Sequence, residues 1–108
     1  MGHSPFPLPQ TYHYILFSLS PPTTDPLRIR KSIQDALSQS FGLTSASTYL
    51  DILWIADDGN QSVVRTGPAD ATRVMAAAAA ASPGAGALRL STTQDSPFLP
   101  SLIPAFSP

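Results

Sequence analysis

The chain has 108 residues, which is enough for one domain but not for a second hydrophobic core. Its formal net charge is −1 and only 12% of its residues are charged, with no Glu and one lysine, Lys31. This balance excludes nucleic-acid binding driven mainly by the protein's own charge, and it favours a buried interface over a free-standing monomer. Without cysteine there is no disulfide framework, thiolate metal site or cysteine nucleophile.

The N-terminal residues also bear on localisation. They lack the basic and apolar regions of a signal peptide. No apolar run approaches the roughly 20 residues that span a bilayer. We therefore expect a soluble intracellular protein without a membrane partner.

Prolines mark the first boundaries in the chain. Residues 1–10 carry Pro5, Pro7 and Pro9, which favour an extended, Pro-rich arm. Residues 11–20 then predict a strand that is apolar on both faces, and Pro21 and Pro22 end it.

A helix is predicted next. Asp25 can cap the free amides at its start, Pro26 suits its first position, and Gly42 suits a left-handed end. Apolar residues recur at helical spacing and are Ile29, Ile33, Ala36, Leu37 and Phe41. The opposite face carries the densest basic cluster of the chain, formed by Arg28, Arg30 and Lys31. This cluster fits either a phosphate-binding patch or an ordinary solvated helix face, and we favour the second.

The strongest signal is Asp58-Gly59, which lies between two runs rich in β-branched and aromatic residues, 48–56 and 61–66. This pattern predicts a β-hairpin, because Asp and Gly tolerate the positive φ of tight turns. Alternation puts one set of side chains on one face, namely Leu50, Ile52, Trp54 and Ala56. The other face then carries Tyr49, Asp51, Leu53 and Ile55. Since both faces are largely apolar, we expect helices to cover one and a partner to cover the other.

A second helix is predicted over residues 69–81, with Asp70 as its cap and six consecutive alanines that bury little area. Residues 87–91 alternate as a short last strand. Residues 93–108 form a Pro-rich, apolar tail that we expect to dock on another surface.

The element order is therefore strand, helix, strand, strand, helix, strand. This order predicts one α/β domain over residues 11–92. Its architecture would be an α+β sandwich with the βαββαβ topology of RRM-like or ferredoxin-like domains. Four antiparallel strands would carry both helices on one face and leave the other face open. The candidate partner interface consists of Tyr12, Tyr14, Leu53, Ile55 and Phe98.

The open face of an RRM-like sheet can bind RNA through aromatic residues. Here the third strand, 61–66, lacks the aromatic residues of the RRM signature. Tyr12 and Tyr14 could stack on bases, although packing or partner contact explains them better. Arg65 lies in an apolar strand, where a charge needs a partner. That partner is either Asp51 or an RNA phosphate, and the sequence leaves both open.

No motif indicates catalysis. Residues 57–60 lack the ligand pattern of a calcium loop, and His3 and His13 do not have metal-ligand spacing. No phosphate-binding, dinucleotide-binding or serine-hydrolase motif is present. We predict a non-enzyme with no metal and no cofactor; a weaker alternative is an enzyme that uses Asp51.

Taken together, the segments resemble the small protein subunits of eukaryotic and archaeal ribonuclease P and ribonuclease MRP, and most of all the smaller fungal-type subunit. The resemblance covers roughly residues 12–92. It rests on Tyr14-Ile15-Leu16-Phe17, Ile33 with Ala36, Phe41-Gly42-Leu43-Thr44, Leu50-Asp51-Ile52-Leu53-Trp54 and Val63-Val64-Arg65-Thr66. Two features depart from the family: Ser45 stands where glycine is frequent, and basic residues are sparse.

The resemblance implies an RRM-like subunit of a ribonucleoprotein whose RNA performs catalysis, in transfer RNA 5′ maturation and ribosomal RNA processing. It implies a heterodimer with a related larger subunit, contacts with other subunits, and a location in the nucleus and nucleolus. RNA contacts would be peripheral and would come from Arg28, Arg30, Lys31 and Arg65. The alternative from another class is a ferredoxin-like regulatory or small-ligand-binding domain that homodimerises through its sheet.

Overall fold

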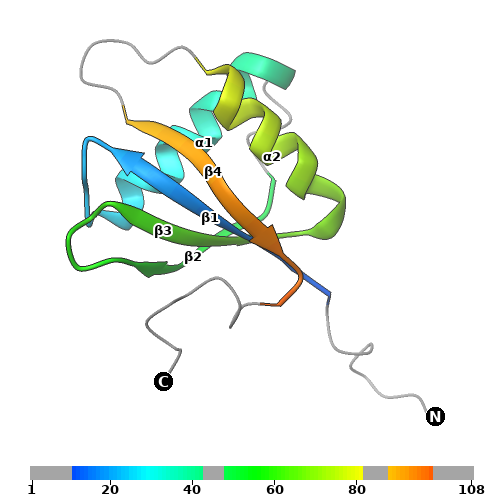
Figure 1. Ribbon diagram of the computed structural model, residues 1–108. Helices are drawn as coiled ribbons and strands as arrows, with labels where there is room; N and C mark the ends of the chain where they lie inside the picture. Colours follow the sequence, from blue (N-terminus) through cyan, green and yellow to red (C-terminus); the bar gives the residue numbers. More distant parts are fainter. Residues whose placement is uncertain (1–10, 43–47, 82–87, 99–108) are drawn as a thin grey trace.

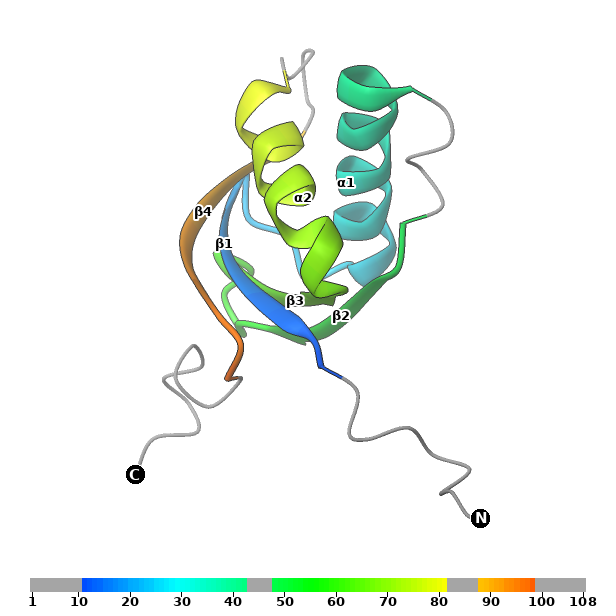
Figure 2. The same cartoon turned by 90° about the vertical axis from the view of Figure 1, so that its right-hand side faces the viewer.

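The structure, a computed structural model, describes residues 11–42, 48–81 and 88–98 (Figure 1). Its elements, in chain order, are β1 (His13–Ser20), α1 (Pro26–Phe41), β2 (Leu50–Ile55), β3 (Gln61–Thr66), α2 (Pro68–Ala80) and β4 (Arg89–Ser96). The strands form one antiparallel sheet in the order β2-β3-β1-β4, and both helices lie on the same side of it (Figure 2). The predicted βαββαβ sandwich is therefore confirmed.

Some expectations lie outside the described residues, namely the N-terminal arm (1–10), Ser45 and the tail from residue 99 onward. No helix in the described part of the chain is long and apolar enough to cross a bilayer.

The local signals for α1 are confirmed at both ends. The carboxylate of Asp25 accepts a hydrogen bond from the backbone amide of Leu27 at 3.0 Å, and Gly42 follows the helix with a φ of +98°. One prediction for this helix is wrong, because Phe41 is 46% exposed and does not join the core. Each step of four residues turns an α-helix about 40° beyond a full circle. Three such steps from Ile29 therefore carry Phe41 out of the buried face.

The β2–β3 hairpin is confirmed, with its turn one residue earlier than Asp58-Gly59. The amide of Gly59 donates to the carbonyl of Ala56 at 2.8 Å, so Asp57 and Asp58 are the central residues of the turn. Gly59 has a φ of +74°, and a Cβ there would lie 2.7 Å from the backbone nitrogen of Thr23. Glycine is required here for both its conformation and its small size.

A bulge in β2 overturns the predicted faces of this strand. Ile52 is paired with Val64 and Trp54 with Val63, so Leu53 has no partner on β3. An extra residue in one strand reverses the alternation that follows it. Ile55 therefore packs with Ile52 against the core beneath the helices, and Trp54 lies on the opposite, open face. The prediction that Ile55 shares the open face is wrong.

The core lies between the sheet and the helices. Its residues without exposed surface are Ile15, Phe17, Ile29, Ile33, Leu37, Val64, Val74 and Ala77. α2 contributes mainly small side chains to it, as the alanine run suggested. The predicted cap of α2 is wrong: Gly67 is the N-cap, and Asp70 lies in the first turn, where it pairs with Arg73. Pro68 starts the helix earlier because its fixed φ suits the first helical position.

β4 is longer than the predicted strand at residues 87–91. It runs to Ser96, so residues 93–96, which the sequence placed in the tail, belong to the sheet. These residues are mostly exposed and show no hydrophobic alternation. Their backbone pairing with β1, where Tyr14 faces Ser96, holds them in the sheet.

Candidate interaction face of the sheet

The face of the sheet opposite the helices carries its own apolar cluster. Leu16 and Val63 form its base and are 4% and 0% exposed. Tyr14 and Trp54 pack against them and remain partly exposed. The register explains the cluster, because Val63 is paired with both Leu16 and Trp54. Aromatic side chains above a small apolar base are typical of surfaces that bind another protein.

Arg65 organises the polar part of the same face. It lies across from Tyr14 on β1 and from Asp51 on β2, and it donates a hydrogen bond from Nη2 to the Asp51 carboxylate at 2.7 Å. Its Nε donates to the Tyr49 hydroxyl at 3.2 Å, and its guanidinium lies 4.4 Å from the centre of the Tyr12 ring. The Tyr12 and Tyr49 rings are 5.8 Å apart. Aromatic rings therefore flank the ion pair on this surface.

The electrostatics of this cluster keep Arg65 charged. Burial acts to lower the pKa of Arg65, but hydrogen bonds and electrostatic interactions with Tyr49 and Asp51 outweigh it, so its pKa is raised above the usual value. The sequence left two partners possible for Arg65, Asp51 or an RNA phosphate, and the structure shows the ion pair with Asp51. The positive charge is therefore already matched by a neighbouring carboxylate.

The other predicted RNA contacts lie on α1, across the sheet from Arg65. Arg30 donates from Nη1 to the backbone carbonyl of Leu50 at 2.6 Å, which joins the helix to the start of β2. Lys31 pairs with Asp35 at 3.2 Å on the exposed side of the helix, and Arg28 is exposed as well. The structure does not gather the four predicted residues into one basic patch.

The predicted partner residues also separate. Tyr12 and Tyr14 belong to the open face, and Leu53 is the bulged residue of the outer strand β2. Phe98 follows β4 at the opposite edge of the sheet and is 70% exposed. Trp54 was assigned to the wrong face, since simple alternation ignores the bulge. Its residue type was the available signal, because Trp and Tyr are enriched at protein interfaces.

Potential metal ligands do not cluster in the part of the chain that the structure describes, where no three His, Cys, Asp or Glu side chains meet. His13 instead contacts Asp95 at 2.6 Å and links β1 to β4.

Comparison with known proteins identifies the family to which the chain belongs. The model of the family described as "Ribonucleases P/MRP protein subunit Pop8" matches residues 11–80, well over half of the chain. A chain of the structure titled "Cryo-EM structure of yeast Ribonuclease MRP" shares the fold, with a TM-score of 0.65 and 18% identity over 81% of this chain and 74% of that chain. No curated protein matches the sequence significantly. As the resemblance predicted, the chain belongs to the ribonuclease P/MRP protein subunit family Pop8.

Proposed function

We propose that this chain is a non-catalytic protein subunit of the ribonuclease P/MRP ribonucleoprotein, in which RNA performs the cleavage. In that complex it supports transfer RNA 5′ maturation and ribosomal RNA processing, and it resides in the nucleus and nucleolus. The observation that carries this proposal is the family match over residues 11–80. The open, aromatic face of the sheet supports it as a surface that needs a partner.

The chain acts by forming a heterodimer with a related, larger subunit through this open face. Trp54 and Tyr14 are the anchors, because they are large and partly exposed and they rest on the buried Leu16 and Val63. Burying such rings supplies much of the affinity of a protein interface. The Arg65–Asp51 pair lies beside them and would fix orientation more than it adds affinity.

RNA contacts are peripheral in this proposal. Arg28 and Lys31 are exposed on α1, where a phosphate could reach them, whereas Arg30 and Arg65 are only partly exposed and bind Leu50 and Asp51. A net charge of −1 cannot sustain strong binding to RNA by the chain alone. Partner subunits would provide most of the contacts with RNA.

The test is purification of the tagged chain from its native cells, with sequencing of the RNA and identification of the proteins that accompany it. Trp54→Asp places a charge on the open face and should lose the complex. Leu27→Asp is the matched control, since Leu27 is 72% exposed on α1, away from that face. Thermal melting of both variants checks that each remains folded.

Recovery of ribonuclease P or MRP RNA with several proteins, lost only in Trp54→Asp, supports the proposal. A homodimer free of RNA would contradict it and would favour the ferredoxin-like regulatory domain instead.

A further inference from the structure

β4 is an outer strand of the described sheet, and the register identifies which of its backbone groups have no partner among the described residues. The amide of Leu19 donates to the carbonyl of Asn60 at 2.8 Å, toward β3, so the backbone polar groups of Leu19 point away from β4. Facing residues in an antiparallel pair alternate between bonded and non-bonded pairs. Leu90 faces Leu19, so it directs its N–H and C=O to the free edge, and so does Thr92.

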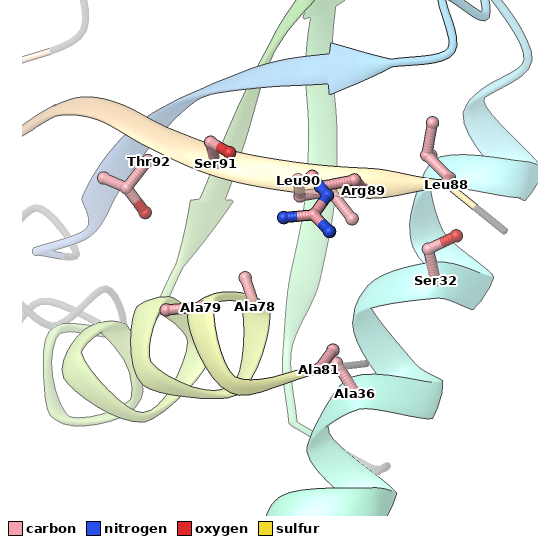
Figure 3. Close-up of a pocket in the computed structure, with 10 residues that line it drawn as sticks. All are labelled: Ser32, Ala36, Ala78, Ala79, Ala81, Leu88, Arg89, Leu90, Ser91 and Thr92. Carbon is pink, nitrogen blue, oxygen red and sulfur yellow. The ribbon is translucent and has the colours of Figure 1, made fainter. Parts of the chain in front are cut away.

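A cavity of about 340 Å³ lies beside this edge, between β4 and the helices (Figure 3). Its lining is Ser32, Ala36, Ala78, Ala79, Ala81, Leu88, Arg89, Leu90, Ser91 and Thr92. Ala78 and Ala79 of α2 lie opposite β4 in this view. Their methyl groups leave room that larger residues would fill. The volume far exceeds the roughly 30 Å³ of one water molecule, so an apolar side chain fits.

Arg89 is the charged residue of this lining, and its side chain extends from β4 toward α2 (Figure 3). Among the described residues, the structure gives it no hydrogen bond or ion pair, unlike Arg30, Arg65 and Arg73. None of the described residues that line the cavity carries a carboxylate. A ligand with an acidic group would therefore complement the site.

We propose that an extended segment of a protein partner joins the sheet as an additional strand at the free edge of β4. Its backbone pairs with Leu90 and Thr92, one apolar side chain enters the cavity between β4 and α2, and a carboxylate binds Arg89. Strand addition of this kind takes affinity from backbone hydrogen bonds and specificity from the pockets beside them. This surface is separate from the open face of the sheet.

The chemistry of the edge favours this occupant over others. Alternating amides and carbonyls match a peptide backbone, whereas RNA phosphates would meet the carbonyls unfavourably. A second copy of β4 would bring another Arg89, and the acidic residue of that strand, Asp95, is already paired with His13 of β1 at 2.6 Å. Both outer strands carry a bulge: that of β2, at Leu53, interrupts the middle of the strand, whereas that of β4, at Thr93, lies beyond Leu90 and Thr92.

The experiment places a photo-cross-linking amino acid at Ala79, an exposed residue of the cavity lining, in the full tagged chain in its native cells. The same group at Asp57, in the exposed β2–β3 turn, is the control. Only the Ala79 position should cross-link to an extended segment of another protein that contains alternate apolar residues and an Asp or Glu. Cross-links to RNA, to a second copy or to residues 99–108 of the same chain would overturn the proposal, as would no cross-link in an intact complex.

Two variants test the mode of binding. Thr92→Pro removes an outward amide, which an edge strand tolerates, and it should lower the cross-link yield about tenfold, whereas Thr92→Val keeps the amide and should not. Arg89→Glu should also lower the cross-link yield. If Thr92→Pro fails to fold, the yield of Arg89→Glu tests the proposed binding mode instead. Unchanged yields would refute strand addition.

The partner is sought within the ribonucleoprotein, so this inference rests on the proposed function. The two can fail separately. The RNA and proteins recovered with the tag report on the proposed function, and the cross-link reports on the β4 edge.

Discussion

Arg30 and Lys31 are adjacent basic residues of α1. The sequence predicts the same RNA contact for both, whereas the structure gives them different partners. We expect Arg30→Gln to destabilise the fold by about 1–2 kcal/mol. Breaking a hydrogen bond to a charged group costs roughly 1.5–3 kcal/mol, and the site is only partly buried, so water recovers part of this. Lys31→Gln should cost less than about 0.5 kcal/mol, because its Asp35 pair is an exposed i,i+4 pair.

Urea unfolding followed by circular dichroism measures both free energies on the purified chain. For a domain of this size, about 4–8 °C of melting temperature corresponds to 1 kcal/mol. Arg30→Gln should therefore melt about 4–16 °C below the parent chain, and Lys31→Gln within about 4 °C of it. Equal stabilities would refute a structural role for the bond to Leu50 and would return Arg30 to the candidates for RNA contact.

Four further substitutions test the fold and the proposed heterodimer. Gly59→Ala should cost about 2–4 kcal/mol in urea unfolding, from left-handed strain and the 2.7 Å approach to Thr23; a loss below about 1 kcal/mol would contradict the tight turn. Leu37→Ala should cost about 2–5 kcal/mol but Phe41→Ala under about 1 kcal/mol, and a reversed order would put Phe41 back in the core. Asp51→Ala should weaken the proposed heterodimer, measured by titration, and make the melting temperature of the chain less sensitive to salt, because it removes an ion pair that salt screens; unchanged values would make the pair dispensable.

Much of this fold follows from local sequence. Asp25 and Pro26 begin α1 and Gly42 ends it, as expected from their side-chain hydrogen bonding and allowed backbone angles. The hairpin follows from its Asp-rich turn and from Gly59, the turn residue that adopts a positive φ. The element order then leaves few topologies, so the four-stranded sheet with both helices on one side could be predicted.

The candidate site depended on contacts between distant segments. One extra residue in β2, Leu53, reverses the faces of Trp54 and Ile55, and only the pairing of β2 with β3 reveals it. The length of β4 likewise depends on β1, because its polar residues carry no periodic signal of their own. Local residue preferences therefore determined where the helices and the hairpin occur. The pairing of the four strands decided which side chains a partner can reach, because register depends on interactions that no single segment contains.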